Sequence, residues 1–335
     1  MLFMKVRHHT TVGEVAVQGS TRNLTWEISA LDEGGRMETF VRRRLPHLSR
    51  RQSAKAIEEN AFVVNGRLAT KGQRLKQGDR VIFQGAQHWL LDSPVRIEIG
   101  GVKIAYEDAE IILLDKPAGI PTHGFSARDV DTLANFILAR WPELFSVGRS
   151  RWEPGLLNRL DTETSGLVMV AKNQPAFNHL REQFRRRRVT KKYIALVWGA
   201  AASSGSISLA IAHEPSDNSR MQVVNEFASD RLRPRSWHAL TCFRKLASSD
   251  EMSLLEISMK TGVTHQIRVH LAAIGHAIVG DSLYGSKNYR TILERHFLHA
   301  SRLDFAHPAN DQPMVVESPL PTELSSFLKR IEIVG

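Results

Sequence analysis

The sequence has little that would support disulfide, redox or metal chemistry. Its 335 residues include one cysteine, Cys242, so a disulfide within the chain and a zinc site built on cysteines are both excluded. His265, His270 and His276 lack the i, i+4 spacing of two metal ligands on one helical face. We therefore expect no metal and no cofactor, and a single thiol suits a reducing cytoplasm.

Long apolar runs are also lacking. No run approaches the roughly 18 residues of a membrane-spanning helix. Residues 1–11 carry Lys5, Arg7 and two histidines, without the apolar core of a signal peptide. A Gly-rich phosphate loop, tandem repeats and low-complexity tracts are missing as well. We expect a cytoplasmic protein that has no membrane partner.

Basic residues, by contrast, are in excess. Lysine and arginine together number 45 against 35 aspartates and glutamates, which gives a formal net charge of +10. This balance favours a polyanionic partner, either nucleic acid or an acidic membrane surface, and charge alone does not choose between them. With 42% hydrophobic residues, the chain can build the cores of one large and one smaller domain.

Two short basic helices are predicted near the start of the smaller domain. Residues 36–45 have the apolar spacing of an amphipathic helix that ends at Pro46, and Ser49 is a suitable N-cap for a second helix over 50–60. A basic helical face can be simply solvated, but together the cations of these helices predict a phosphate-binding surface. They are Arg42, Arg43, Arg44, Arg50, Arg51 and Lys55.

A small sheet is predicted to follow these helices. Residues 62–67 form a β-rich run that closes at an Asn-Gly turn, and 78–83 predicts a second strand. We place the smaller domain at residues 35–86. Residues 1–34 form an arm that we leave unassigned, although 24–28 alternate as a strand would.

Short strands dominate the predicted large domain, residues 105–335, which follows a linker over 87–104. Residues 111–120 indicate a buried strand stopped by Pro and Gly. Polar connections between short strands indicate a largely antiparallel sheet and an α+β enzyme domain. The other predicted elements are helices at 132–141 and 175–187 and strands at 193–198, 206–211, 221–224, 236–245 and 253–259.

Six cations lie within eight residues around the end of the second of these helices. We predict that they bind RNA rather than only solvate the surface, because they lie close in the chain to the polar segment around Asp161, a candidate site. They are Arg185, Arg186, Arg187, Arg188, Lys191 and Lys192.

A polar, turn-prone segment lies between two apolar runs in residues 155–172. Residues 167–171 indicate a short buried strand, so Asp161 is predicted to lie in a loop on a rigid scaffold. An aspartate beside Thr and Ser can serve only to cap a turn. The surroundings of Asp161 instead favour a functional role.

This segment closely resembles the Arg-Leu-Asp motif of pseudouridine synthases that act on uridines of large-subunit ribosomal RNA and of some transfer RNAs. The resemblance implies that Asp161 is the catalytic aspartate and that Arg159 fills the stack vacated by a flipped base. Asn158 departs from the family's usual His. The matching stretches are Arg159-Leu160-Asp161, Thr164-Ser165-Gly166-Leu167 and Ala171-Lys172.

Two further stretches are similar to the second and third motifs of the family. Lys192-Tyr193 matches the second motif, which implies that Tyr193 lies against the target uracil; without the resemblance it would equally be an ordinary strand tyrosine. Residues 261–271 match the third, in which Arg268 would pair with the catalytic carboxylate. Val263 departs from the frequent Arg of this motif.

The resemblance extends over nearly all of the chain from about residue 35. Residues 280–285 and 298–300 also resemble the family's sequence, and residues 35–86 resemble the RNA-binding module of ribosomal protein S4. What this implies is a mainly antiparallel pseudouridine synthase domain preceded by a small α/β RNA-binding domain.

The activity implied is isomerisation of specific uridines in structured RNA, with the target base flipped out of its stack. The expected substrate is 23S ribosomal RNA and the expected state a monomer; a transfer RNA synthase and a catalytically silent RNA-binding or ribosome-assembly factor remain alternatives. The carboxylate of Asp161 would act as a nucleophile on the ribose or as a base at the neighbouring position, and the resemblance does not decide which.

Overall fold

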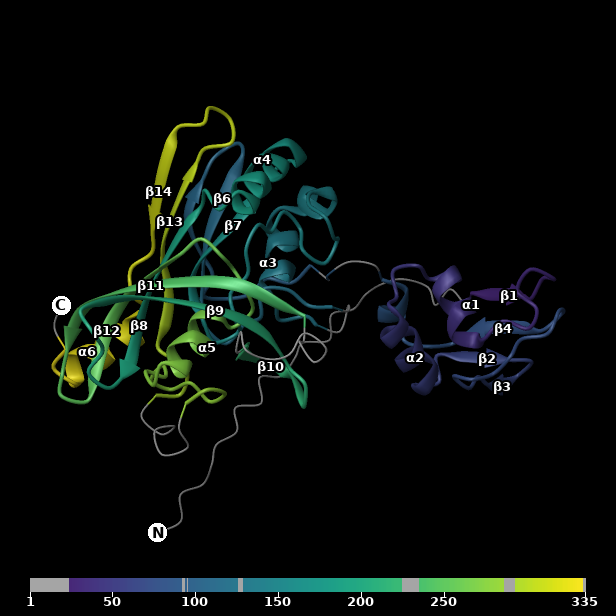
Figure 1. Ribbon diagram of the computed structural model, residues 1–335. Helices are drawn as coiled ribbons and strands as arrows, with labels where there is room; N and C mark the ends of the chain where they lie inside the picture. The colour runs from purple at the N-terminus through teal and green to yellow at the C-terminus, as the bar shows by residue number, and fades with distance from the viewer. Residues whose placement is uncertain are drawn as a thin grey trace, which may run out of the picture. The chain divides into compact units, whose positions relative to one another are not determined.

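The computed structural model describes residues 24–91, 94, 96–125, 129–224, 235–285 and 293–333. The chain divides into two compact units, Met1–Leu91 and Asp92–Gly335 (Figure 1), and we describe each by itself. No helix in the described ranges is both long and apolar enough to cross a membrane.

The smaller unit packs two helices against a four-stranded antiparallel sheet. The sheet has the order β1-β4-β2-β3, with Asn65 and Gly66 in the β2–β3 turn. Ser49 and Gln52 form a capping box at the start of the second helix, as the sequence predicts. The elements are β1 (Thr25–Glu27), α1 (Met37–Arg44), α2 (Arg50–Glu58), β2 (Phe62–Val64), β3 (Arg67–Leu68) and β4 (Arg80–Phe83).

This unit is longer at both ends than the predicted 35–86. Strand β1 pairs with β4, so part of the arm that we left unassigned belongs to the sheet. Beyond residue 86, the Trp89 side chain is 3% exposed in the same apolar core, which shortens the predicted linker. The alternation over 24–28 indicates the first addition, whereas a single tryptophan has no periodicity of its own and does not indicate the second.

A long sheet forms the larger unit, as predicted for an α+β domain. Its described strands follow the order β10-β9-β11-β12-β8-β13-β7-β6-β5, with β14 paired to β13. All of these pairs are antiparallel except β7 with β13. The strands are β5 (Lys103–Glu107), β6 (Ile111–Lys116), β7 (Ser165–Ala171), β8 (Thr190–Trp198), β9 (Ser204–Glu214), β10 (Asp217–Val224), β11 (Ser236–Ser248), β12 (Met252–Met259), β13 (Leu298–Ala306) and β14 (Pro313–Glu317).

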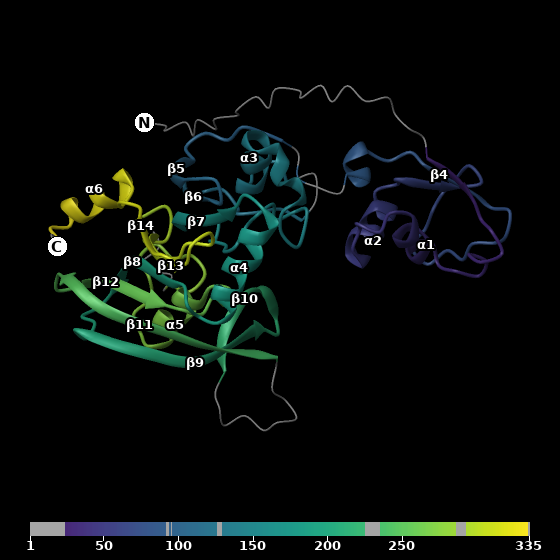
Figure 2. The ribbon, with the colours of Figure 1, turned by 90° about the horizontal axis from the view of Figure 1, so that it is seen from above.

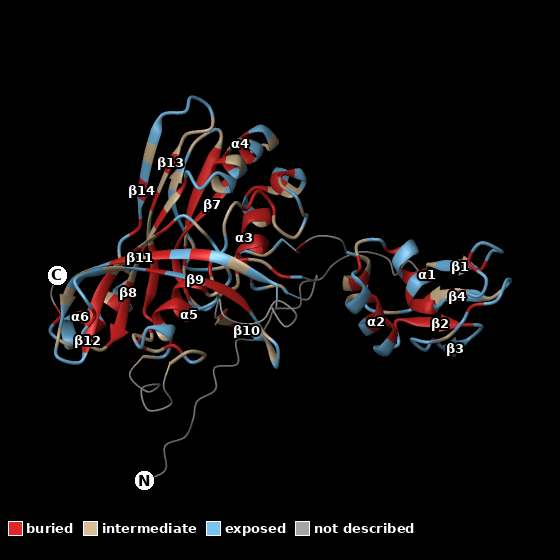
Figure 3. Ribbon diagram, viewed as in Figure 1, coloured by how far each residue is buried: buried red, intermediate tan, exposed pale blue. Residues whose placement is uncertain are grey.

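Helices cover different parts of this sheet. The predicted helices appear as α3 (Leu133–Arg140) and α4 (Gln174–Arg185), whereas α5 (Gln266–Ala273) and α6 (Thr322–Arg330) were not predicted. In Figure 2, α4 lies beside β7 while α5 lies by β9, β10 and β11, in agreement with the contacts between these elements. Strands β6 and β7 are almost wholly buried, most residues of β8 and β12 are buried too, and β14 is largely exposed (Figure 3).

Gly166 allows β7 and β13 to approach each other where the candidate catalytic loop enters the sheet. It pairs with Ala300, and a Cβ atom added to Gly166 would lie 2.2 Å from the Ala300 carbonyl oxygen. Its φ of +112° is also a conformation that side chains of L-residues rarely adopt. The position therefore requires glycine for two independent reasons.

We expect Gly166→Ala to destabilise the larger unit by about 3 kcal/mol or more, because backbone atoms of β13 must shift and the residue is strained. Urea denaturation of the full chain measures this loss. Gly100→Ala is the control, since its Cβ would meet nothing within 4 Å. Equal midpoints for Gly166→Ala and the wild type would contradict the prediction.

Candidate active site

Asp161 lies in a pocket of about 1400 Å³ in the larger unit. The loop over 156–164 forms one wall, and residues 259–268 form another, with Lys191 and Tyr193 of β8 between them in the lining. Phe177, Arg181 and Phe184 of α4 add a rim that is both apolar and basic. The predicted residues Arg159, Asp161, Tyr193 and Arg268 are thus brought to one cavity.

Arg268 joins two carboxylates. Its Nη1 donates to Asp161 Oδ2 at 2.9 Å, while Nε and Nη2 donate to Asp281 at 2.7 and 2.9 Å. Asp281 also accepts hydrogen bonds from the backbone N–H groups of Leu283 and Tyr284. The family resemblance implies the pairing of Arg268 with Asp161, and the structure contains this contact.

Burial and charge act in opposite directions on these groups. Burial opposes the charge of Arg268, but the two carboxylates outweigh it and raise the pKa of the guanidinium. Burial would likewise raise the pKa of the Asp281 carboxyl, yet the hydrogen bonds from Arg268 hold that pKa below its usual value. The Asp281 side chain is 0% exposed and that of Asp161 26%, so Asp161 is the carboxylate open to a substrate.

Lys116, at the end of β6, fixes the backbone of the loop that carries Asp161. Its Nζ donates to the carbonyl oxygens of Pro117, Ile120 and Thr162 at 2.9, 2.8 and 3.1 Å. Burial lowers the pKa of this ammonium to about 7, although Glu163 and Asp161 nearby favour its charge. One side chain therefore ties the loop over 117–120 to the residue directly after Asp161.

Two further side chains hold the loop before Asp161. The hydroxyl of Thr122 donates to the carbonyl of Leu160 and accepts from its N–H, at 2.7 and 3.0 Å. Asn158 accepts from the Met169 N–H at 2.8 Å and donates to the Leu167 carbonyl at 3.3 Å. The departure at Asn158 thus bears on how the loop is attached to β7.

Behind the loop, Arg295 and His296 hold the residues after Asp161. Arg295 Nη1 donates to the Glu163 carbonyl at 3.0 Å, and His296 Nε2 lies 2.7 Å from the Thr164 hydroxyl. Burial lowers the pKa of His296 to about 3, so the imidazole is neutral there. Arg295 also donates to Glu323 of α6, which links that helix to the loop.

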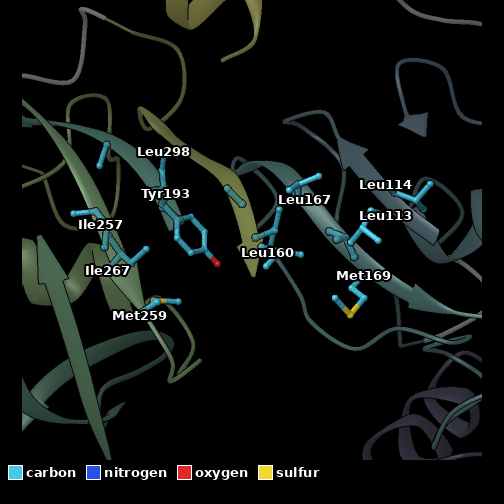
Figure 4. Packing of buried hydrophobic residues seen from close by; sticks show 14 of the residues in the cluster. Leu113, Leu114, Leu160, Leu167, Met169, Tyr193, Ile257, Met259, Ile267 and Leu298 are labelled. Carbon is cyan, nitrogen blue, oxygen red and sulfur yellow. The ribbon is translucent and has the colours of Figure 1, made fainter. Parts of the chain in front are cut away.

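Tyr193 faces the cavity from β8. Figure 4 shows its ring among buried apolar side chains, with the hydroxyl directed away from Leu298. The residue is 5% exposed, and burial, with Asp161 nearby, raises the pKa of its hydroxyl. A neutral, apolar-backed ring next to a carboxylate is suited to contact with a planar base.

Arg159 is exposed at the rim of the pocket. Its Nη1 donates to His123 Nε2 at 2.9 Å, and both residues line the cavity. Arg159 therefore lies at the mouth of the cavity, on the same loop as Asp161.

Of the six cations predicted to bind RNA around the end of α4, the four arginines are exposed, but the two lysines are engaged in other contacts. Arg185 and Arg186 share Glu182, whereas Arg187 and Arg188 follow the helix. Lys191 is 6% exposed and donates to the Thr261 carbonyl, and burial lowers its pKa to about 8.

Lys192 lies on the other face of β8 from Tyr193, because side chains alternate along a strand. It pairs with Glu256 at 3.4 Å and lines a separate cavity of about 420 Å³. The prediction that both lysines extend a basic surface beside the site is thus not supported by their positions.

In the smaller unit, several predicted cations are engaged in ion pairs. Arg43 and Arg44 both bind Asp32, and Arg50 and Lys55 lie 3.8 and 4.0 Å from glutamates. Arg42 and Arg51 are exposed. Asp32 is only 8% exposed, so it holds Arg43 and Arg44 more firmly than an exposed carboxylate would, whereas the exposed pair of Lys55 with Glu59 is weak and phosphates can compete for it.

Sequence reasoning missed the supporting residues of the site. Asp281 lies in a segment that resembles the family, but nothing in the sequence indicates that it pairs with Arg268. Lys116 precedes a proline at a strand end, which signals a turn and not a buried ammonium.

Val263 packs beside a small apolar cluster that includes Ile211 and Met221. No group of three or more potential metal ligands occurs among the described residues.

We expect Lys116→Met to destabilise the larger unit by about 2 to 4 kcal/mol, because three carbonyl oxygens lose their donor in a buried place. Guanidinium denaturation followed by tryptophan fluorescence gives the change. Lys103→Met, which changes an exposed lysine of β5, should alter stability by less than about 0.5 kcal/mol. A loss no larger than that of this control would argue against the anchoring role.

Comparisons with known proteins match both units. A sequence model of the RNA pseudouridylate synthase family matches residues 110–273, and one of the S4 domain matches residues 36–81. A protein of Chloroflexus aurantiacus named "Uncharacterized RNA pseudouridine synthase" is 35% identical over 89% of this chain and 90% of its own length.

Two other proteins are similar over much of the chain. "Ribosomal large subunit pseudouridine synthase D" of Nitrosomonas europaea is 34% identical over 97% of this chain and 93% of its own length. Among solved structures, human RNA Pseudouridylate Synthase Domain Containing 1 aligns with a TM-score of 0.55 at 27% identity, covering 69% of this chain and 90% of that one.

Proposed function

The chain belongs to the RNA pseudouridylate synthase family and carries an S4 domain, and we propose that it isomerises uridines of 23S ribosomal RNA with Asp161 as the catalytic residue. The contact of Asp161 with the buried Arg268 carries this proposal. The Asp161 carboxylate is directed into the pocket, while Arg268, its countercharge, is held in place by Asp281.

The reaction requires one carboxylate that remains ionised. The bond between N1 of uracil and the ribose carbon breaks, and carbon five of the same uracil then bonds to that carbon. Carbon five releases its proton and N1 takes one up, so the product is an isomer of the substrate. Asp161 either attacks the ribose or removes a proton at the neighbouring position, and both routes need its negative charge. The planar fork of Arg268 favours that charge.

Access to the uracil requires that the nucleotide leave its stack. Extrusion costs a few kcal/mol, which contacts in the vacated stack and in the pocket must offset. Arg159 at the rim is placed for the first kind of contact, and Tyr193 inside the cavity for the second.

Ribosomal RNA is the proposed substrate because relatives named as ribosomal large subunit synthases match over nearly the whole chain. The S4 domain would add affinity through exposed cations such as Arg42 and Arg51, whose contact with phosphates carries no sequence information. Target choice would then depend on RNA shape around the pocket, and transfer RNA is the alternative substrate.

We expect Asp161→Asn to lower the rate of isomerisation at least about a thousandfold, because an amide is neither a competent nucleophile nor a base. Folding and RNA affinity should stay within about 1 kcal/mol of wild type. Release of tritium from carbon five of uracil in 23S ribosomal RNA measures the reaction, since substrate and product have equal mass.

Two outcomes would contradict the proposal differently. Wild-type rates for Asp161→Asn would remove the catalytic role of this residue. Wild-type protein that binds RNA but releases no tritium from any cellular RNA would favour a silent binding factor. Release from transfer RNA alone would change the proposed substrate and leave the chemistry intact.

Arg268→Lys should lower turnover about 10- to 100-fold, since lysine keeps the charge but cannot hold Asp281 and Asp161 together in one plane. Single-turnover rates with saturating enzyme isolate this effect from binding. Arg302→Lys is the matched control, because Arg302 pairs with Asp304 and Glu317 beside the separate cavity. Full activity of Arg268→Lys would mean that the fork is not needed.

A further inference from the structure

His265 lies directly before α5 and lines the pocket that contains Asp161. Its φ of 55° and ψ of 17° place it in the left-handed region, which is uncommon for residues other than glycine. One turn later, the same helix carries Arg268. The side chains of both residues approach one oxygen, Asp161 Oδ2, at 3.8 Å for His265 Nε2 and 2.9 Å for Arg268 Nη1.

A chain of hydrogen bonds reaches the other nitrogen of this imidazole. The backbone N–H of Met221 in β10 donates to the Tyr284 hydroxyl oxygen at 2.8 Å. The same hydroxyl lies 2.9 Å from His265 Nδ1. Arg220 and Arg268 lie 5.5 and 5.3 Å from the centre of the Tyr284 ring, and burial raises the pKa of Tyr284, so the hydroxyl keeps its proton.

These contacts favour one of the two nitrogens of His265 as the carrier of the hydrogen. The Tyr284 oxygen already accepts from Met221, and its own hydrogen finds an acceptor in His265 Nδ1. If Nδ1 carried a hydrogen instead, the hydroxyl hydrogen would have no acceptor among the described residues. A neutral imidazole has one donor and one acceptor, so the hydrogen lies on Nε2, on the side of Asp161.

The remaining oxygen of Asp161 is then left for chemistry. Oδ2 has both Arg268 and His265 on its side, whereas Oδ1 accepts no hydrogen bond within the part of the chain that the structure describes. A separation of 3.8 Å is longer than a hydrogen bond, but such contacts often tighten when a substrate is bound. A neutral donor can orient the carboxylate without adding a second positive charge to it.

We propose that His265 is a positioning residue of the site, a neutral imidazole whose Nε2–H orients Asp161 through Oδ2 and so presents Oδ1 to the ribose. This inference rests on the proposed function. Burial lowers the pKa of His265, which keeps the ring neutral at pH 7. The charged and titratable groups that face it are Asp161, Arg268, Asp281, Tyr284 and His213.

The tautomer is tested first, by nitrogen NMR of the histidine side chains of the full chain. The His265 signals are identified by their loss in His265→Asn. We expect the pattern of an imidazole that is protonated on Nε2, and protonation on Nδ1 would overturn the inference.

The role in catalysis is tested with His265→Asn. Asparagine tolerates the left-handed backbone and keeps an acceptor near Nδ1, so this variant removes chiefly the Nε2–H. We expect a roughly tenfold lower single-turnover rate, with RNA affinity unchanged. His179→Asn, on α4 and outside the pocket lining, is the control and should keep the wild-type rate.

Tyr284→Phe provides a second variant with a different readout. It removes the donor to Nδ1 that favours the neutral ring, so the pKa of His265 rises. Protonated His265 would bind the Asp161 carboxylate, so activity falls as the pH drops through this pKa. The acid limb of the rate profile should therefore move up by about 0.5 to 1 pH unit.

The double variant separates the possible results. In the His265→Asn background, Tyr284→Phe should no longer move the acid limb, whereas an equal shift there would overturn the inference. A wild-type rate for His265→Asn would also overturn it, and if Asp161→Asn is still inactive, the proposed function stands. Circular dichroism of each variant confirms that it is folded before the rates are compared.

Discussion

A buried guanidinium that serves two carboxylates at once is the constraint on which the site depends. The side chain of Arg268 is 6% exposed and that of Asp281 0%, and either charge alone would cost several kcal/mol in such surroundings. Their two-point pairing neutralises both and leaves Nη1 to donate to Asp161. Because Asp281 compensates the charge of the buried Arg268, Asp161 does not have to be buried as well. It can remain partly open to the pocket and still have a fixed countercharge.

This arrangement works only if the loop that carries Asp161 is itself fixed. The loop has no regular secondary structure, so its backbone groups find partners in side chains from elsewhere: Lys116 at the end of β6, Thr122 in the loop that follows, and Arg295 in the segment before β13. Gly166 then brings the start of β7 against β13. The position of the carboxylate therefore depends on several strands and on the loops that connect them.

Sequence patterns predicted most of the fold but only part of the site. Apolar spacing and turn residues located α1, α2, α3 and α4 and the main strands, because these signals lie within a few residues of each other. Pairing of β1 with β4, or of Arg268 with Asp281, is set by tertiary packing and leaves no local pattern. The lysines 191 and 192 show the same limit. A run of cations in sequence was interpreted as one surface, whereas alternation along β8 buries the first and sends the second to the opposite face.

Asn158 and Val263, the two departures from the family motifs, make contacts that leave the groups around Asp161 in place. Asn158 binds the β7 backbone through both ends of its amide, a loop attachment that requires no ionisable group. Val263 lies beside apolar residues, while the hydrogen-bonding groups around Asp161 come from positions 265, 268 and 281. Neither substitution removes a donor or acceptor from the chain that connects Asp281, Arg268 and Asp161. The contact of Asp161 with Arg268 and Asp281 behind it can therefore be retained while loop attachment and the pocket lining vary.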